Sequence, residues 1–194
     1  MVFMRTMKIL VIVGHPDTQS FCTSLAKIYL KGAKRSGART RLLRLSELTF
    51  DPILHKGYKQ VQKLEKDLLI AQKDILWADH LVFVYPVWWY SFPAILKGFI
   101  DRVILPGFAF KYTGPLRWNK YLKGKTAHLI MTTGGPAWYY KILGNPSKAA
   151  MKKTLGFCGV KTKKVTVIGN AAQINKKRAI KELAKVNTMG SKQI

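Results

Sequence analysis

The chain alternates between short apolar runs and longer segments in which apolar residues recur at helical spacing. The first run, residues 8–13, is continuously apolar after its lysine and rich in β-branched residues, which is typical of a strand. A polar break follows at residues 14–17, and residues 20–36 then place apolar side chains three and four positions apart. This pattern predicts a strand, a loop and a helix.

The same alternation continues to the end of the chain. Further strands are predicted at residues 39–45, 81–85, 126–131 and 163–168. Further helices are predicted around residues 59–78, 93–103, 149–157 and 175–186, and residues 105–125 are predicted to be irregular. Strands that alternate with helices favour a parallel sheet covered by helices on both faces. We therefore predict a single α/β domain over residues 1–188 and a flexible C-terminal tail over residues 189–194.

Membrane and export signals are not predicted. The most apolar window, residues 81–96, is shorter than the ~20 residues of a spanning helix, and Pro86 and Pro93 interrupt it. The apolar run at residues 9–13 is too short for a secretory signal. Cys22 and Cys158 lie far apart and give neither a disulfide framework nor the spacing of a metal site. We expect a cytoplasmic protein with reduced thiols and no metal.

The formal net charge is +25, from 34 basic and 9 acidic residues, and residues 111–194 contain a single acid, Glu182. Such an excess raises nucleic acid or an anionic membrane as a partner. However, the lysines are dispersed over predicted helices and loops, and no motif that reads RNA or DNA accompanies them. We therefore do not favour a nucleic-acid-binding protein, because a solvated surface that attracts anionic substrates accounts for the charge.

Three loops with unusual chemistry follow predicted strands. "GHPDTQSF" supplies hydroxyls and the free N–H groups of a helix start, which suit a phosphate. "YPVWWYSFP" concentrates aromatic rings, and "TTGG" joins two hydroxyls to two residues without side chains. Taken alone, each has a simpler interpretation as a helix cap, as rings packed beneath a helix, or as a turn. Because ligands of such sheets bind beyond the carboxyl ends of the strands, the three loops together favour one ligand with an anionic end and a planar end.

The segments "GHPDTQSF", "YPVWWYSFPAILKGFIDRVILPGFAFKY" and "MTTGGPAWYY" resemble the flavodoxin-like NAD(P)H:quinone oxidoreductases, the family of DT-diaphorase and its shorter bacterial relatives. The likeness covers roughly residues 7–170. It implies a flavodoxin-like α/β fold whose five-stranded parallel sheet has the order 2-1-3-4-5. It also implies a non-covalent flavin, a homodimer with active sites at the subunit interface, and ping-pong hydride transfer from NAD(P)H through flavin N5 to a quinone.

The resemblance also assigns site residues. Those implied around the flavin phosphate and ribityl chain are His15, Gln19, Ser20, Phe21 and Cys22. Those implied around the isoalloxazine ring and its polar edge are Pro86, Val87, Trp88, Trp89, Thr132, Thr133, Gly134 and Gly135. Tyr112 matches a tyrosine on the substrate side of the flavin. Tyr140 matches a tyrosine that works with a histidine to settle charge on the reduced flavin, but residues 141–146 contain no histidine.

The resemblance allows two forms of the cofactor and two biological roles. The short C-terminal region favours FMN, with FAD as the alternative. Some short relatives bind flavin while docking on a membrane potassium efflux system as regulatory subunits, and the basic C-terminal half of this chain would suit such peripheral docking. The enzyme interpretation instead predicts NAD(P)H and a quinone as small-molecule partners of a homodimer.

Overall fold

A five-stranded parallel sheet with strand order β2-β1-β3-β6-β7 forms the centre of the computed structural model, which describes residues 6–194. The strands are β1 (Lys8–Val13), β2 (Arg39–Arg44), β3 (His80–Pro86), β6 (Thr126–Thr132) and β7 (Lys161–Ile168). Since β6 and β7 are the fourth and fifth strands of this sheet, the order confirms the predicted flavodoxin-like arrangement.

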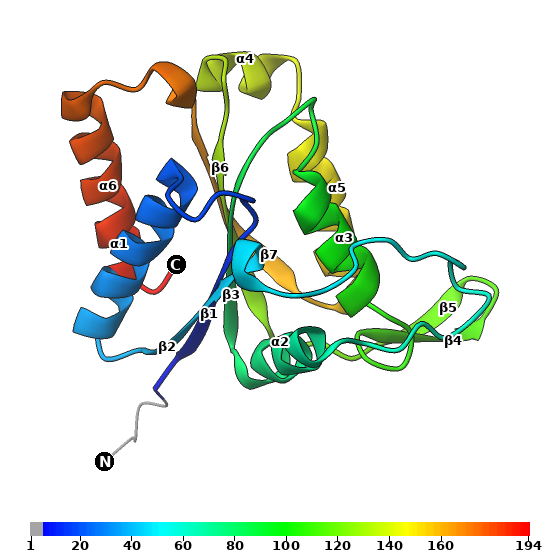
Figure 1. The fold of residues 1–194 in the computed structure, drawn as a ribbon. Helices are drawn as coiled ribbons and strands as arrows, with labels where there is room; N and C mark the ends of the chain where they lie inside the picture. Colours follow the sequence, from blue (N-terminus) through cyan, green and yellow to red (C-terminus); the bar gives the residue numbers. More distant parts are fainter. Residues whose placement is uncertain (1–5) are drawn as a thin grey trace.

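Helices cover both faces of the sheet (Figure 1). On one face lie α1 (Phe21–Arg35) and α6 (Lys176–Ser191), and on the other α2 (Lys66–Trp77), α3 (Ala94–Val103) and α5 (Pro146–Cys158). The short helix α4 (Ala137–Ile142) lies at the top, beyond the carboxyl ends of the strands. Two 3-10 turns, η1 (Leu45–Glu47) and η2 (Ala171–Gln173), complete the helical elements of the described residues.

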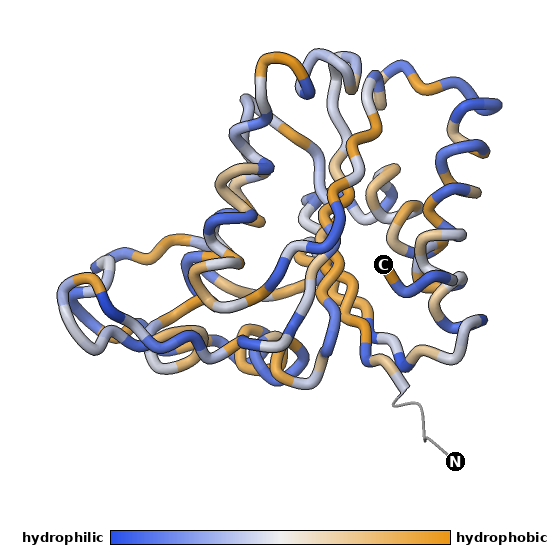
Figure 2. Tube along the Cα trace, turned by 180° about the vertical axis from the view of Figure 1, so that it is seen from behind, coloured by the Kyte–Doolittle hydropathy of each residue, from blue (hydrophilic) through white to orange (hydrophobic). Residues whose placement is uncertain are grey.

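The apolar run of β1 supplies both halves of the core. Its side chains alternate, so that Ile9 and Val11 pack in the cluster of α1 and α6, whereas Leu10 and Ile12 join the cluster formed with α2, α3 and α5. The apolar strands run through the middle of the molecule between the two helical layers (Figure 2). The sheet is therefore a rigid support for the loops that leave its carboxyl edge.

Two segments correct the sequence prediction. The helix expected from residue 59 begins only at Lys66, and residues 51–65 form an irregular loop, because Arg102 draws the two ends of that segment together. Residues 105–125 are not wholly irregular, since they contain an antiparallel hairpin, β4 (Phe110–Gly114) and β5 (Arg117–Lys120). Trp118 of this hairpin stacks on Phe157 of α5 with ring centroids 4.5 Å apart, which fixes the hairpin to the body.

The end of the chain packs against the sheet and α1. Helix α6 continues to Ser191, into the segment predicted to be a tail. The Ile194 carbonyl accepts hydrogen bonds from the Tyr29 hydroxyl at 3.1 Å and from Nδ1 of the buried His128 at 2.9 Å. His128 is thus part of the interior. No helix within residues 6–194 combines the length and the apolar character needed to cross a bilayer.

Candidate functional site at the carboxyl edge of the sheet

The loops after β1, β3, β6 and β7 surround an open cavity of about 480 Å³, which we call the strand-end cavity. It is lined by His15, Phe21, Cys22, Pro86, Val87, Trp88, Trp89, Thr132, Thr133, Gly134, Tyr140, Ala171 and Ala172. Most of the predicted site residues therefore lie together. Gln19, Ser20 and Gly135 belong to the same loops without lining the cavity, and Tyr112 lies elsewhere.

The loop after β1 presents the start of α1 to this cavity. Ser20 is the N-cap, and its Oγ accepts the Thr23 N–H at 3.3 Å. The N–H groups of Phe21 and Cys22 have no acceptor within residues 6–194. Because N–H groups in a first helical turn carry the positive end of the helix dipole, this helix start suits an anion. The Ser20 hydroxyl itself serves as the cap.

His15 lies between the loops after β1 and β3. Its Nδ1 accepts the Asp17 N–H at 2.9 Å, and its ring meets Trp88 edge to face with centroids 5.5 Å apart. Burial lowers the pKa of His15, while the charge of Asp17 and its backbone hydrogen bond act in the opposite direction. With Nδ1 occupied as an acceptor, the neutral ring carries its proton on Nε2, which is a donor for a ligand.

The loop after β3 is a tight turn made of aromatic residues. Trp88 and Ser91 form an antiparallel bridge, so that Trp89 and Tyr90 take the two corner positions. Their φ angles are positive, 49° and 59°, a conformation that costs side chains other than glycine about 1 kcal/mol or more each. The Trp89 side chain is 96% exposed, yet it lines the cavity. Strain retained in a cavity wall is typical of binding sites.

The loop after β6 closes the opposite side of the cavity. The Thr132 hydroxyl lies 3.5 Å from the Cys22 Sγ and links this loop to α1, while the Thr133 hydroxyl donates to the Gly135 carbonyl at 2.8 Å. A Cβ added at Gly134 would meet no atom within 4 Å, so the backbone there faces open space. This loop can therefore offer its N–H groups to a ligand edge at close range.

Ala171 and Ala172, in the turn after β7, line the cavity although no pattern in the sequence predicts them there. The Ala171 N–H donates to the Thr133 carbonyl at 2.9 Å, so this turn supports the β6 loop. Gly169 lets the turn approach the start of α4 closely, because a Cβ at this position would lie 2.2 Å from the Ala137 nitrogen. The available signal was positional: Gly169 and Asn170 follow a predicted strand whose end reaches the same edge.

The two tyrosines to which the resemblance assigns catalytic roles are separated. Tyr140 lines the strand-end cavity, next to Tyr90 and Tyr139, whose hydroxyls lie 3.2 Å apart. Tyr112 instead lines a second cavity of about 610 Å³ beside the β4–β5 hairpin, which we call the hairpin cavity. Its lining is Tyr58, Phe92, Lys97, Ile100, Asp101, Ile104, Pro106, Phe110, Tyr112, Lys153, Thr154, Phe157 and Cys158. Within one chain, Tyr112 and Tyr140 thus belong to different cavities.

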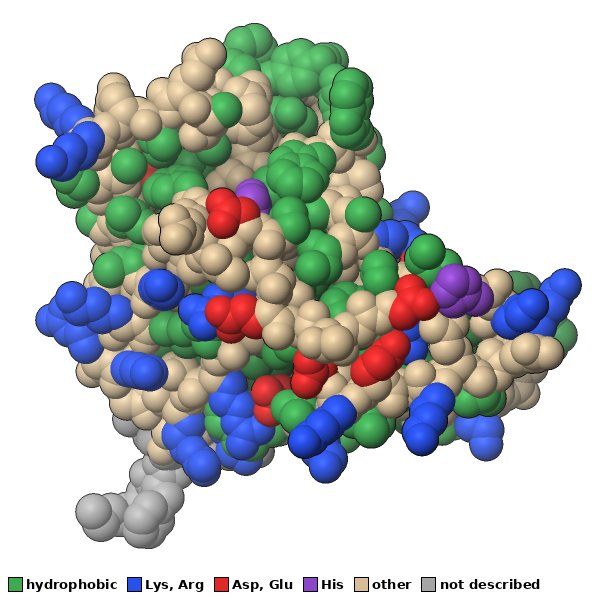
Figure 3. Space-filling model, viewed as in Figure 1, with side chains coloured by type: hydrophobic (Ala, Val, Ile, Leu, Met, Phe, Trp, Pro, Cys, Tyr) green, Lys and Arg blue, Asp and Glu red, His purple; other side chains and the backbone are tan. Residues whose placement is uncertain are grey.

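The strand-end cavity is apolar and carries no Lys, Arg, Asp or Glu among its lining residues. Hydrophobic side chains gather at the top of the molecule, over α4 and the strand ends, whereas basic side chains spread along the sides and the lower edge (Figure 3). Any anionic group bound in this cavity would therefore be held by N–H donors and the dipole of α1 rather than by a salt bridge. The planar walls suit an aromatic ring.

Comparison with known proteins places this geometry in a family. Residues 7–188 match the family model described as "Flavodoxin-like fold". Ribosyldihydronicotinamide dehydrogenase (quinone) from Mus musculus is 32% identical to this chain over 181 residues, which cover 79% of this chain and 78% of the relative. The chain belongs to the flavodoxin-like NAD(P)H:quinone oxidoreductase family.

Solved structures share the family architecture. The crystal structure of Smu.1420 from Streptococcus mutans matches with a TM-score of 0.82 and 29% identity, over 96% of this chain and 100% of that one. An FMN-dependent NADH-azoreductase from Bacillus anthracis, in complex with FMN, matches with a TM-score of 0.72 and 20% identity, over 97% and 99% of the two chains. The second likeness shows the shared fold alone.

Proposed function

We propose that this chain is a flavin-dependent NAD(P)H:quinone oxidoreductase with the flavin in the strand-end cavity. When bound, the flavin would take a hydride at N5 from NAD(P)H and pass two electrons to a quinone in ping-pong order. The observation that carries the proposal is that the N–H groups of Phe21 and Cys22, which have no acceptor within the described residues, lie beside an aromatic wall at the strand ends of this family's sheet.

The residues present fit a flavin. Its phosphate would lie on the N–H groups of Phe21 and Cys22 at the start of α1, where no protein acceptor competes within the described residues. Its planar ring would lie along Val87 to Trp89, and its polar edge would face the open backbone at Gly134. These backbone donors also suit the negative charge of a reduced ring, because they are fixed before the reaction.

We propose FMN as the cofactor form, with FAD as the alternative. The strand-end cavity has room for a ligand of about 480 Å³, within the usual 300–1,000 Å³ of ligand sites, and its lining has no basic side chain for a second phosphate. The FMN complex of the structural neighbour from Bacillus anthracis is a further reason to test FMN first. The cofactor released from purified protein, identified by mass, distinguishes the two forms.

We further propose that the enzyme is a homodimer in which the hairpin cavity of one chain supplies the substrate side for the strand-end cavity of its partner. The support is the separation of Tyr112 from Tyr140 within one chain, together with the exposure of Tyr58 and Tyr112 in the lining of the hairpin cavity. Nicotinamide and quinone would then occupy the space between the two cavities in turn. Molar mass in solution by light scattering tests this arrangement, and a flavin-loaded monomer with full activity would contradict it.

The test of function is direct. Purified protein should be yellow, and it should oxidise NAD(P)H when menadione is supplied as the acceptor. Trp89→Ala should weaken flavin binding more than His128→Ala, because Trp89 lines the cavity whereas His128 is buried beneath α1 and the C-terminus. A colourless protein that takes up no added flavin refutes the function, and equal flavin dissociation constants for the two variants refute the placement of the site.

A further inference from the structure

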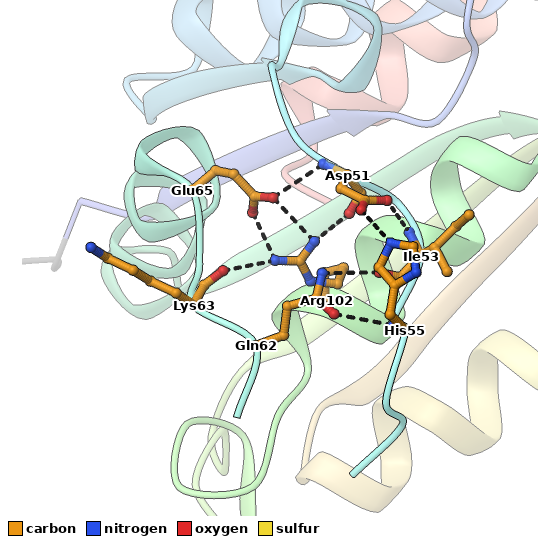
Figure 4. A network of polar contacts seen from close by, with 7 residues as sticks. All are labelled: Asp51, Ile53, His55, Gln62, Lys63, Glu65 and Arg102. Atoms are coloured by element: carbon orange, nitrogen blue, oxygen red, sulfur yellow. Dashed lines mark hydrogen bonds and ion pairs between the residues drawn. The ribbon is translucent and has the colours of Figure 1, made fainter. Parts of the chain in front are cut away.

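A buried guanidinium closes the irregular loop formed by residues 51–65. Arg102 of α3 has a fully buried side chain, and its two terminal nitrogens donate to the carbonyl oxygens of Asp51 and Lys63 and to both oxygens of the Glu65 carboxylate. The Lys63 and Glu65 bonds through Nη2 measure 3.0 and 2.8 Å. Figure 4 shows the two ends of the loop converging on this one side chain.

Further contacts hold the loop in one conformation. The Asp51 N–H donates to Glu65 Oε1 at 3.1 Å. Gln62 connects the two sides of the loop, because its side chain donates to the Ile53 carbonyl at 3.0 Å and accepts the His55 N–H at 3.1 Å (Figure 4). At the base, the backbone of α3 is pressed against Pro52, since a Cβ at Gly98 would lie 2.3 Å from the Pro52 Cβ. The loop is therefore fixed to α3 over one helical turn.

Stability alone does not explain the choice of arginine. Burying a guanidinium costs free energy, and the Arg102 Nε–H has no acceptor within the described residues. An apolar side chain would fill the same space at a lower cost in free energy. What the guanidinium provides is geometry: a planar fork binds a carboxylate through two parallel bonds and still reaches two carbonyls. Such a group fixes where the loop begins and ends.

The loop carries Tyr58 to the hairpin cavity. Tyr58 is 68% exposed and lines that cavity together with Lys97 and Asp101 of α3. Asp101 directly precedes Arg102 in this helix. The same turn of α3 thus forms one wall of the cavity and holds the loop that forms another. We propose that Arg102 is a positioning residue for the hairpin cavity, and that the loop it closes places Tyr58 in contact with the electron acceptor. This inference rests on the proposed function, in which the quinone enters that cavity.

Limited proteolysis tests the closure without any need for activity. Lys56, Lys59 and Lys63 are tryptic sites within the loop, and cleavage there requires local opening. Arg102→Lys keeps the charge but loses the fork, and it should accelerate cleavage at these lysines by about fivefold or more. Arg41→Lys is the matched control, because Arg41 bonds Asp74 at 2.5 Å on α2, away from the loop. If Arg102→Lys does not fold, Glu65→Gln and Gln62→Ala replace it. Unchanged cleavage of the loop in the folded variants overturns the closure.

Kinetics test the role of Tyr58. With NAD(P)H as donor, kcat/KM is measured for menadione and for ferricyanide, a small acceptor of which two molecules are reduced per NAD(P)H. The ratio of the menadione value to the ferricyanide value should fall about fivefold in both Tyr58→Ala and Arg102→Lys. The double variant should be no worse than Tyr58→Ala, since Arg102 acts through Tyr58. Additive losses, or an unchanged ratio in Tyr58→Ala, overturn the assignment. A wild-type chain that binds no flavin overturns the acceptor role together with the proposed function, and the proteolysis still decides whether Arg102 closes the loop.

Discussion

Trp88 and Ser91 exchange two backbone hydrogen bonds, 3.0 Å from the Trp88 N–H to the Ser91 carbonyl and 2.8 Å in the opposite direction. This pairing closes a two-residue turn in which both corner residues need positive φ. Asparagine and glycine usually occupy such positions. Here Trp89 and Tyr90 occupy the corners at 49° and 59°. The sequence thus retains two aromatic rings where the backbone disfavours them, which points to a role for the rings themselves.

Trp89→Gly should therefore leave the fold intact or stabilise it while weakening flavin binding. The Trp89 ring is almost fully exposed, so its loss removes little packing, and relief of the positive-φ strain should raise the free energy of unfolding by up to about 1 kcal/mol. The lost aromatic wall should raise the flavin dissociation constant about tenfold. Urea denaturation of the apoprotein and flavin fluorescence titration measure the two effects.

Tyr90→Gly is the matched control for this substitution. Tyr90 shares the positive φ of its neighbour but does not line the strand-end cavity. It should show a smaller gain in stability, because the Tyr90 ring also contacts Tyr139 and Tyr140, and a smaller loss of flavin affinity. A Trp89→Gly variant that binds flavin as tightly as the wild type would show that the turn serves another purpose.

Gly169→Ala should distort the backbone that supports the strand-end cavity. Its Cβ would lie 2.2 Å from the Ala137 nitrogen and 2.9 Å from the Gly135 carbonyl oxygen, and both are backbone atoms that can yield only if α4 and the β6 loop move. We expect a loss of about 1–3 kcal/mol in the free energy of unfolding, together with weaker flavin binding. Urea denaturation and flavin titration are again the measurements.

Gly156→Ala is the control for adding a methyl group. Gly156 lies within α5, and a Cβ there would meet no atom within 4 Å. Alanine should therefore stabilise the protein by about 0.5–1 kcal/mol and leave flavin binding unchanged. Equal effects of the two substitutions would contradict the support that the β7 turn gives to the cavity.

Much of the site could be predicted because its loops follow strands with clear patterns. The apolar runs that become β1, β3 and β6 locate three strand ends, and parallel strands bring their carboxyl ends to one edge. Local chemistry then selects Trp88 and Thr132, and the family resemblance adds His15; the three line one cavity. The order of the strands came from the family resemblance, because hydrophobic periodicity does not report which strands are neighbours.

Other features depend on contacts between distant residues and leave little local signal. The 51–65 loop replaces a predicted helix because Arg102, far along the chain, binds its ends. The hairpin within residues 105–125 is held by Trp118 stacking on Phe157 of α5. Ala171 lines the cavity only because its backbone reaches Thr133. In each case a tertiary contact decides a conformation that the local sequence leaves open.

The cysteines should be unreactive in the folded protein. Burial raises the pKa of Cys22 and of Cys158 to about 11. Since the thiolate is the reactive form, about one thousandth of each thiol would be ionised at pH 8. Ellman's reagent should therefore label neither cysteine in the native protein and both in guanidinium chloride. Rapid labelling of native Cys22, which lines the strand-end cavity, would show that this wall opens to solvent.

Two buried histidines should make the protein sensitive to acid. Burial lowers the pKa of His80 to about 4 and that of His128 to about 4. His80 lies near the start of β3 with its Nδ1 2.7 Å from the Thr126 hydroxyl, and its Nε2 has no partner within the described residues. Because the folded pKa lies below the unfolded value of about 6.5, the unfolded chain binds more protons between these limits.

Stability from these histidines is therefore complete above about pH 6.5 and is lost as the pH falls toward 4, by up to about 1.4 kcal/mol per pH unit for each ring. His80→Asn keeps a donor near the position of Nδ1 but cannot be protonated, so it should reduce the slope of unfolding free energy against pH between 6 and 5 by about one proton. Urea denaturation at several pH values measures that slope. Val82→Ala, at a buried position on the same strand, should lower stability without changing the slope, which separates a loss of packing from a loss of proton linkage. A wild-type slope in His80→Asn would mean that this ring is protonated in the folded protein as readily as in the unfolded chain.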